Sequence, residues 1–396
     1  MSQGRGGTIR PGTGKTPPCK HSQQIDAPTG AKTFYYRDPN LKDFLTLLMP
    51  LPTDPSERLQ RLKRWLGTLD PALELRLTTL QPASSDASFR RYFRLESAKS
   101  SLVVMDAPPP HEDCRPFVDV SERLDAVGLT VPKVLAQDLT EGFLLLTDLG
   151  RQNYLERIGQ GIEDGELQAL YRPALLALAK LQKANASGLA AFDQPRIVQE
   201  LGLFTHWYIE QHHGVSPTPE QLNQLDTIFV LLAKSMTAEP QVLVHRDFHS
   251  PNLMVCTDPA VGSNPGVIDF QDALLGPISY DIASLVFDAR TTWEESQQLD
   301  WAIRYWENAR TAGLPVPEDF AQFHRQYEWA SLQRNLRILG VFARLNIRDN
   351  KPHYLAHIPR VLQYTRQVTR RYGPFGPLAR LLDTLENVKP ETRLTF

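Results

Sequence analysis

A short polar loop between apolar runs narrows the folds that this chain can adopt. Residues 244–252 read Val-His-Arg-Asp-Phe-His-Ser-Pro-Asn, and the apolar run Leu-Met-Val follows at 253–255. A second apolar run, Gly-Val-Ile at 266–268, ends at Asp269. The stretch between the two runs is rich in Asp, Pro, Gly, Ser and Asn, which is typical of a hairpin connection. The sequence therefore predicts two paired strands, with Asn252 before the first strand and Asp269 after the second.

Three polar side chains of this region, Asp247, Asn252 and Asp269, are the types that phosphoryl transfer to a hydroxyl requires. Asp247 can orient an acceptor hydroxyl and take its proton, whereas Asn252 and Asp269 offer the oxygen ligands that Mg²⁺ on ATP needs. Their order matches the kinase catalytic-loop pattern H-R-D-x-x-x-x-N, followed by a strand-borne Asp. A single His-x-Asp triplet would be ordinary, but the linked pattern indicates a phosphotransferase site that uses ATP and Mg²⁺.

Composition limits the partners and the compartment. The 396 residues are 41% hydrophobic and carry a formal charge of −2 without a long Lys/Arg run, so a nucleic-acid partner is not expected. The three cysteines, Cys19, Cys114 and Cys256, are far apart and lack metal-binding spacing, which favours a reducing compartment, the cytoplasm. No apolar stretch is long enough for a membrane span or for the core of a signal peptide. We therefore expect a cytoplasmic enzyme that acts on a small molecule.

Residues 1–48 differ from the rest of the chain and read as a disordered extension. They are rich in Gly, Pro, Ser, Thr, Lys and Gln, and Met49 is a candidate for the natural start of the protein. The stretch Gly12–Thr16 ends like a P-loop, but the first glycine of that motif would fall at Ile9, and two prolines follow. A phosphate cradle needs a strand before it and a helix after it, so we assign this stretch to disordered sequence.

The remaining sequence predicts an α+β protein with the two-lobe, protein-kinase-like fold. In the first lobe, 49–147, an amphipathic helix begins at Ser56, and the order strand, strand, helix, strand, strand then predicts a small antiparallel sheet. The expected strands are 89–95, 102–105, 134–136 and 143–146, and the helix between them is 116–127. The second lobe, 148–396, is predicted to be mainly α-helical apart from the catalytic hairpin, with long helices at 167–184 and 322–345.

These motifs resemble those of the aminoglycoside phosphotransferase and choline kinase superfamily, which contains small-molecule kinases with a protein-kinase-like fold. His249, two residues after Asp247, is typical of that superfamily. Within it, the chain looks most similar to the bacterial anomeric kinases of N-acetylmuramate and N-acetylglucosamine. The similarity covers about residues 56–390, and the stretches that carry it are 85–94, 104–109, 142–150, 245–252, 266–273 and 337–345.

The resemblance implies an ATP-dependent kinase that phosphorylates the anomeric C1 hydroxyl of N-acetylmuramate and N-acetylglucosamine in peptidoglycan recycling. It implies Asp247 as the base, with Asn252 and Asp269 as Mg²⁺ ligands. The residues expected to support the catalytic loop are His245, His249 and Asp281, although a helix N-cap explains the last one equally well. Two alternatives stay open. One is another small-molecule kinase of this fold, acting on an aminoglycoside, choline or a similar amine, and the other is a nucleotide-binding pseudokinase.

One departure from the kinase pattern concerns the positive charge that holds the nucleotide phosphates. Kinases place a lysine on the third strand, whereas residues 103–106 read Val-Val-Met-Asp, with Met105 at the expected position. We hypothesise that Arg90, Arg91 or Arg94 supplies the charge, and the alternative is that these arginines only solvate a strand face. The residues predicted to bind the nucleotide are Ser88, Phe89, Arg90 and Arg91, together with Thr147, Asp148 and Leu149 as a hinge whose backbone pairs with adenine.

Recognition of the sugar leaves weaker signals in the sequence. Trp207 could stack on a sugar ring, although an aromatic residue at helical spacing more often packs in the core. Arg334, Arg337 and Arg344 could reach the lactyl carboxylate of N-acetylmuramate, because bidentate arginine suits that group. A solvated helix face is the alternative for each of these arginines.

Overall fold

A computed structural model of the protein describes residues 55–85, 89–256 and 262–387. All of them belong to one compact unit, Leu51–Phe396. The expected extension 1–48 lies outside the described residues, as do Met49 and Ser88. None of the helices in the described part of the chain combines the length and the apolar character needed to cross a bilayer.

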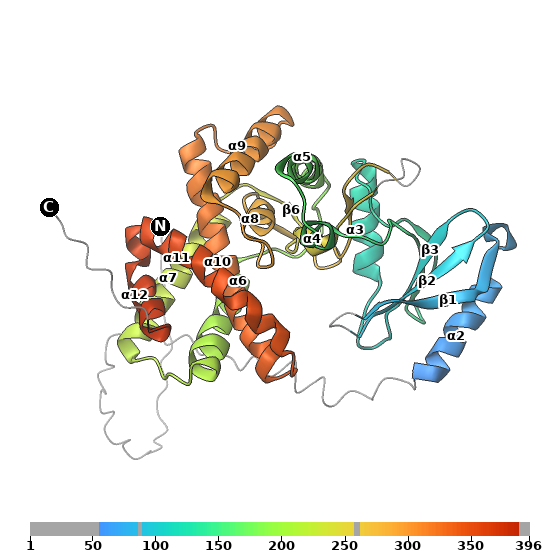
Figure 1. The fold of residues 1–396 in the computed structure, drawn as a ribbon, viewed down its shortest axis with the longest axis horizontal. Helices are drawn as coiled ribbons and strands as arrows, with labels where there is room; N and C mark the ends of the chain where they lie inside the picture. Colours follow the sequence, from blue (N-terminus) through green and yellow to red (C-terminus); the bar gives the residue numbers. More distant parts are fainter. Residues whose placement is uncertain (1–54, 86–88, 257–261, 388–396) are drawn as a thin grey trace, which may run out of the picture. The chain divides into compact units, whose positions relative to one another are not determined.

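The first lobe is built on a five-stranded antiparallel sheet with the strand order β1-β2-β3-β5-β4 (Figure 1). Helix α2 (Pro55–Thr68) packs on one face, and α3 (Arg115–Ala126) packs on the other. The predicted lobe boundary, 147/148, falls directly after the last strand. The strands are β1 (Leu75–Ser85), β2 (Arg91–Ser97), β3 (Ser101–Asp106), β4 (Val134–Asp138) and β5 (Phe143–Thr147).

Strand alternation explains why the sheet carries a helix on each face. Successive side chains of a strand point to opposite faces. On β2, Phe93 and Leu95 pack against Leu62 of α2, which defines the α2 face of the sheet. On β3, Met105 belongs instead to the core that contains α3, which defines the α3 face. Because both faces are buried, the apolar run of β5 is unbroken in the sequence.

The four predicted strands are present as β2, β3, β4 and β5, but the prediction missed β1 at the edge of the sheet. The register of β1 against β2 shifts between Arg76 and Gln81, and again between Pro82 and Ser84. An edge strand tolerates such bulges and an internal proline. They also break the regular alternation by which a strand is recognised in a sequence, so the segment had no clear strand signal.

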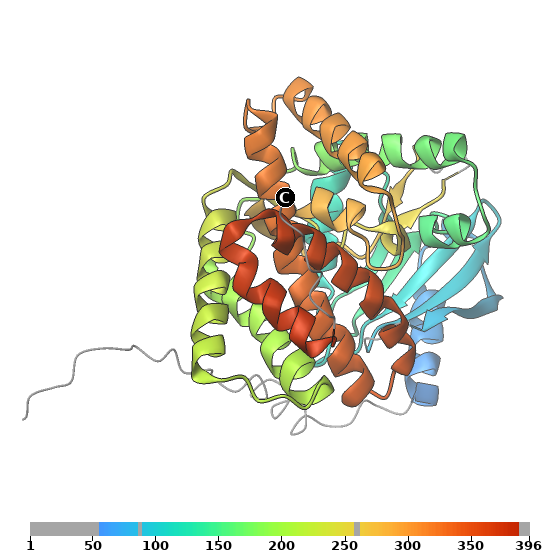
Figure 2. The same ribbon diagram turned by 60° about the vertical axis from the view of Figure 1, so that its left-hand side comes forward.

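The second lobe is mainly α-helical, as predicted, and its longest helix, α10, contacts α6, α7, α8 and α11. Figure 2 shows α7, α10 and α11 as neighbours. A π-helical segment, η2 (Phe204–His212), continues α6. The α-helices are α4 (Tyr154–Gly159), α5 (Asp164–Leu181), α6 (Gln194–Leu203), α7 (Pro219–Thr237), α8 (Tyr280–Val286), α9 (Glu295–Thr311), α10 (Phe320–Ile347), α11 (Ile358–Arg371) and α12 (Gly376–Leu385). Short 3₁₀ turns are η1 (Pro71–Leu73), η3 (Ser250–Asn252), η4 (Pro352–His357) and η5 (Gly373–Phe375).

A glycine on α10 lets this helix approach the junction of α6 and η2 closely. A Cβ atom at Gly340 would lie 2.4 Å from the carbonyl carbon and oxygen of Leu203, and 2.7 Å from the amide nitrogen of Phe204. No residue with a side chain fits at that distance unless the backbone moves. Gly340 therefore fixes how near α10 lies to the segment that carries Trp207.

Four short strands flank the catalytic segment. β7 (Leu253–Met254) pairs with β8 (Gly266–Val267), which confirms the predicted hairpin. β6 (Gln241–Val244) pairs with β9 (Leu274–Pro277) and was not predicted. Residues 242–244 of β6 are all buried, so this strand has no polar alternation to distinguish it from a buried helix.

Candidate active site

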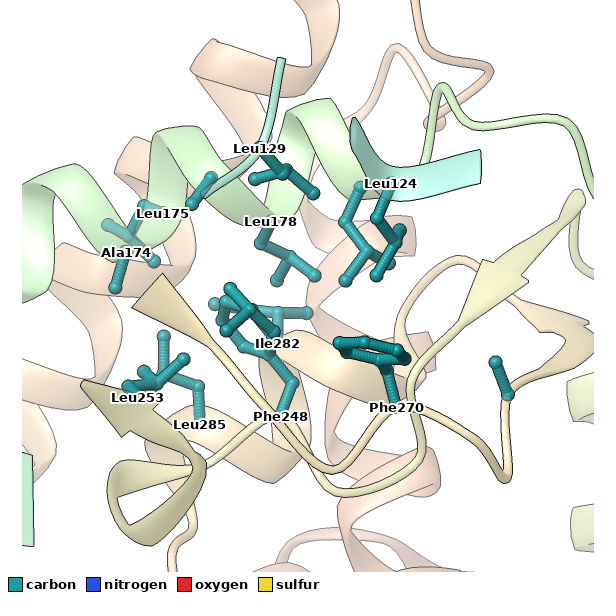
Figure 3. Close-up of a cluster of buried hydrophobic side chains, with 14 of the residues drawn as sticks. Leu124, Leu129, Ala174, Leu175, Leu178, Phe248, Leu253, Phe270, Ile282 and Leu285 are labelled. Carbon is teal, nitrogen blue, oxygen red and sulfur yellow. The ribbon is translucent and has the colours of Figure 1, made fainter. Parts of the chain in front are cut away.

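Two buried phenylalanines anchor the catalytic segments in the core. Phe248 follows Asp247, Phe270 follows Asp269, and both rings are fully buried. Figure 3 shows them in one cluster with leucines of α5 and with Ile282 of α8. Because each ring is fixed in the core, the backbone of the aspartate directly before it has little freedom to move.

Asp281 binds the backbone of the catalytic loop. Its two carboxylate oxygens accept hydrogen bonds from the backbone N–H groups of His245 (2.7 Å) and Arg246 (2.9 Å). The N-cap position of α8 belongs to Ser279, so the capping alternative for Asp281 does not apply. Burial raises the pKa of Asp281 above its usual value, while the hydrogen bonds from the backbone N–H groups of His245 and Arg246 oppose this effect.

His245 ties the loop to the segment before Asp269. Its Nε2 lies 2.9 Å from the carbonyl oxygen of Ile268, so the Nε2–H group donates. Its Nδ1 accepts the backbone N–H of Asp247 at 3.3 Å. These two partners together require the neutral Nε2–H tautomer.

The backbone is strained at two points of the site. Arg246 has φ = 76° and Asp269 has φ = 64°, the left-handed region that residues with a Cβ atom rarely adopt. Each such residue costs about 1–2 kcal/mol. Strain of this kind persists only where surrounding contacts over-determine the conformation, and it gathers at functional sites.

Asp247 lies against the guanidinium group of Arg334. Nη1 and Nη2 of Arg334 each lie 3.3 Å from Oδ1 of Asp247, and Nη1 also donates to the carbonyl of Arg246 at 2.7 Å. The side chain of Asp247 is 34% exposed, whereas that of Arg334 is buried. Burial by itself would raise the pKa of Asp247, but Arg334 and Arg337 lower it well below its usual value. Asp247 is therefore ionised at neutral pH and can accept a proton.

Asp288 holds the middle of the catalytic loop and was not predicted. Its Oδ2 accepts the backbone N–H of Ser250 at 3.1 Å and the hydroxyl of the same residue. Nδ1 of His249 lies 4.0 Å from Oδ1 of Asp288. Burial lowers the pKa of His249 below its usual value, so the ring is neutral at pH 7. His249 and Asp288 thus form a buried support for the loop between Asp247 and Asn252.

Asn252 and Asp269 lie side by side. Nδ2 of Asn252 donates to the carbonyl of Asp247 at 3.0 Å and lies 3.4 Å from Oδ2 of Asp269. Gln271 donates to Oδ1 of Asp269 at 2.8 Å, a contact that was not predicted. Within the described residues, no cluster of three or more His, Cys, Asp or Glu side chains could hold a metal. Mg²⁺ on a nucleotide needs only one or two protein ligands besides phosphate oxygens, so an amide and a carboxylate fit it.

The three arginines considered for the nucleotide phosphates have different surroundings. Arg91 pairs with Asp106, which also binds Arg58 of α2, so its guanidinium lies on the α2 face. Arg94 binds both carboxylate oxygens of Asp148. Arg90 pairs with Glu112, in the segment before α3. The structure therefore separates Arg91 from the other two arginines.

The predicted hinge directly follows β5. Thr147 is the last residue of that strand, and its hydroxyl accepts the backbone N–H of Lys133 at 2.9 Å. Asp148 accepts hydrogen bonds from Arg94 and from the hydroxyl of Ser101. Leu149 is buried. The side chains of the hinge are thus used for structure, and pairing of its backbone with adenine stays a prediction.

The residues predicted to contact the sugar differ in their surroundings. Arg337 pairs with Glu200 of α6 at 3.4 Å, and Glu200 also binds Arg246 of the catalytic loop. Trp207 is half-buried against the second hydrophobic core, which agrees with the packing interpretation.

Phe89, which was predicted to bind the nucleotide, is 47% exposed and stacks on His111. The sequence offered one usable signal for a missed residue: Asp288, like Asp269, directly follows an apolar run.

The fold and this set of side chains define a kinase of the protein-kinase-like class. A family model described as phosphotransferase enzyme family matches residues 79–320, so the chain belongs to that family. The N-acetylmuramate/N-acetylglucosamine kinase of Pseudomonas aeruginosa is 45% identical over 83% of this chain and 97% of its own length. The kinase of the same name from Neisseria meningitidis is 44% identical over 86% of this chain and its full length.

Solved structures agree on the fold. Plasmodium vivax ethanolamine kinase superposes with a TM-score of 0.53 and covers 82% of this chain and 92% of its own. Its sequence is only 11% identical, so this similarity establishes the fold alone. Together with the antiparallel sheet and the helical second lobe, it confirms the predicted α+β, protein-kinase-like fold.

Proposed function

We propose that this protein is an ATP- and Mg²⁺-dependent kinase that phosphorylates the anomeric C1 hydroxyl of N-acetylmuramate and N-acetylglucosamine. The observation that carries this proposal is an ionised Asp247, braced through its loop by Asp281, with Asn252 and Asp269 beside it. Relatives that are 44–45% identical over almost their whole length bear the name N-acetylmuramate/N-acetylglucosamine kinase. The product, a sugar 1-phosphate, would serve peptidoglycan recycling, and the need for ATP favours the cytoplasm.

The low pKa of Asp247 suits an anomeric acceptor. A carboxylate held far below its usual pKa is a weak base, so it would orient the hydroxyl and accept the proton late in the reaction. An anomeric hydroxyl is more acidic than an ordinary alcohol and therefore needs less help from a base. Asn252 and Asp269 would hold Mg²⁺, which neutralises charge on the nucleotide phosphates.

The charges around Asp247 weigh against the amine-kinase alternative. Arg334 contacts Asp247, and Arg337 is close enough to lower its pKa. Two guanidinium groups next to the predicted base disfavour a polycationic acceptor such as an aminoglycoside, and they favour a neutral or anionic sugar. The pseudokinase alternative is disfavoured because a scaffold has no need of a strained, fully braced catalytic loop.

The test is ADP release by the purified protein with Mg²⁺-ATP. The acceptors are N-acetylmuramate, N-acetylglucosamine, their 1-O-methyl glycosides, kanamycin and choline, and Asp247→Asn is the control. Turnover on the free sugars should vanish with the 1-O-methyl forms, and Asp247→Asn should lose about 10²- to 10⁴-fold in kcat. Turnover on kanamycin or choline alone would support the amine-kinase alternative. ATP binding without any turnover would support the pseudokinase alternative.

A further inference from the structure

The strands that cover the nucleotide in kinases carry no lysine in this chain. Kinases hold the phosphates with a lysine of the third strand, which is ion-paired with a glutamate of the following helix. Here β1, β2, β3 and β5 contain no lysine, and Met105 of β3 is buried in the core. A phosphotransferase of this fold must therefore take that positive charge from another side chain.

The alternation of β2 decides which arginine faces the side of the catalytic loop. Tyr92 packs against the core that contains α3, so Arg94, two residues later on the strand, lies on the α3 face. Arg90 lies directly before β2, and its ion pair with Glu112, just before α3, places it on the same side. Arg91 lies on the α2 face, where Asp106 binds it. The α3 face is the one shared with the core of Phe248 and Phe270, so Arg91 is on the wrong side of the sheet.

The remaining two arginines are held by different acidic side chains. Arg94 donates to the two carboxylate oxygens of Asp148, at 2.6 and 3.0 Å, and belongs to the hinge. Arg90 lies just before β2, and its Nε is 3.0 Å from Oε2 of Glu112. The side chains of this pair are only 15% and 12% exposed. An arginine directly before β2 and a glutamate just before α3 thus resemble the strand lysine and helix glutamate of kinases.

Contacts on both sides fix the Arg90–Glu112 pair. On the side of the helix, Glu112 lies just before α3, and α3 is anchored by its Phe117, whose ring centroid is 4.8 Å from that of Phe270. Phe270 directly follows the predicted metal ligand. On the side of the sheet, the neighbouring rings of Phe89 and His111 stack at 4.7 Å.

The charge of Arg90 reaches the acidic turn that contains Asp269. Burial alone would lower the pKa of Arg90, while Tyr92 and Glu112 raise it. Asp272, in the turn after Asp269, raises it as well. This influence of Asp272 indicates that the guanidinium group lies within electrostatic range of the segment that would hold Mg²⁺.

We propose that Arg90 binds the phosphates of the nucleotide and that Glu112 positions it, so that an Arg–Glu pair replaces the Lys–Glu pair of other kinases. A guanidinium group has five N–H donors, and its Nε can hold Glu112 while its terminal nitrogens bind phosphate. The inference rests on the phosphotransferase function but not on the identity of the sugar. Glu112 is a positioning residue, because it acts through Arg90.

The test is the affinity of the purified full chain for Mg²⁺-ATP, ADP and adenosine, measured by calorimetry without sugar. Arg90→Ala should weaken ATP and ADP binding about 10- to 100-fold, the value of a charge-assisted hydrogen bond, and leave adenosine binding unchanged. Arg90→Lys should restore part of the affinity. Glu112→Gln should raise the KM for ATP more than it lowers kcat, and Glu112→Asp should recover part of the change.

Arg115→Ala is the matched control. Arg115 follows Glu112 by three residues, its side chain is 73% exposed, and among the ion pairs of the described residues it pairs only with Asp113. Its nucleotide affinity should equal that of the unmodified protein. The proposal is overturned if Arg90→Ala binds ATP within twofold of the unmodified protein, or if it loses adenosine binding to the same extent. If Arg90→Ala weakens ATP and ADP binding but the unmodified protein does not turn over either amino sugar, the proposed sugar activity is contradicted and the role of Arg90 is supported.

Discussion

Arg334 of α10 donates to a single oxygen of Asp247 from both of its terminal nitrogens, each at 3.3 Å, so the predicted base has a permanent cation at its side. The same guanidinium also holds the carbonyl of Arg246, which is one of the strained residues of the loop. The contact therefore sets both the charge and the position of the carboxylate. It also gives Arg334 a place beside the base, and the predicted contact with a lactyl carboxylate stays untested.

We expect Arg334→Gln to shift the acid limb of the pH–rate profile upward. The pKa of Asp247 is depressed by Arg334, so removal of that charge raises the pKa, and the carboxylate becomes protonated at higher pH. Loss of the positioning contact should also lower kcat at neutral pH by about 10²-fold. The measurement is kcat from pH 9 down to the lowest pH at which the protein stays folded. Arg348→Gln, at the exposed end of the same helix, is the control, and an acid limb that stays in place would contradict the assignment.

Asp281→Asn should destabilise the protein, because an amide has one oxygen and can accept only one of the two backbone hydrogen bonds that the two carboxylate oxygens accept. We expect the free energy of unfolding to fall by about 1.5–3 kcal/mol, the value of a buried hydrogen bond to a charged group. Urea unfolding measures this change. Asp300→Asn removes a carboxylate from an exposed pair with Arg304 and should change stability by less than about 0.5 kcal/mol. Equal effects of the two substitutions would show that the loop does not depend on Asp281.

Glu239 should make stability depend on pH between about 4.5 and 8. Burial raises the pKa of Glu239 to about 8, while Ser279 opposes this effect. A raised pKa in the folded state means that stability from this group is fully present below the unfolded pKa and is lost as the pH rises through the folded value. Glu239→Gln should remove this dependence and raise the melting temperature at pH 8 relative to the unmodified protein. Glu220→Gln, on the exposed start of α7, should leave the pH profile of the melting temperature unchanged.

Gly340→Ala should destabilise the second lobe, although alanine is the better helix former. The new Cβ atom would meet the backbone of Leu203 at 2.4 Å, and overpacking of this kind costs about 1–3 kcal/mol. A Cβ atom added at Gly165 of α5 would have no neighbour within 4 Å. Gly165→Ala should therefore raise the free energy of unfolding by up to about 1 kcal/mol. Denaturant unfolding of both variants tests the pair. Stabilisation by both would mean that α10 shifts without cost.

The sequence allowed prediction of the chemical groups but not of their supports. Asp247, Asn252 and Asp269 fall in two segments joined by a short hairpin, so local spacing is enough to find them. Arg334 follows Asp247 by 87 residues, and Asp288 follows Ser250 by 38. Their contacts depend on how α8 and α10 pack, which no local pattern encodes. Nor could the sequence choose between Arg90 and Arg91, because alternation separates them but does not say which face carries α2.

The Arg90–Glu112 pair also has a consequence for chemical probes. Reagents that label kinases by acylating the conserved strand amine depend on a neutral lysine, a state that a guanidinium group does not reach at physiological pH. Since β1, β2, β3 and β5 offer no amine, such reagents should leave these strands unmodified. Amine-directed profiling would then not report on these strands, and dicarbonyl reagents that condense with guanidinium groups would be the appropriate probes for the nucleotide site.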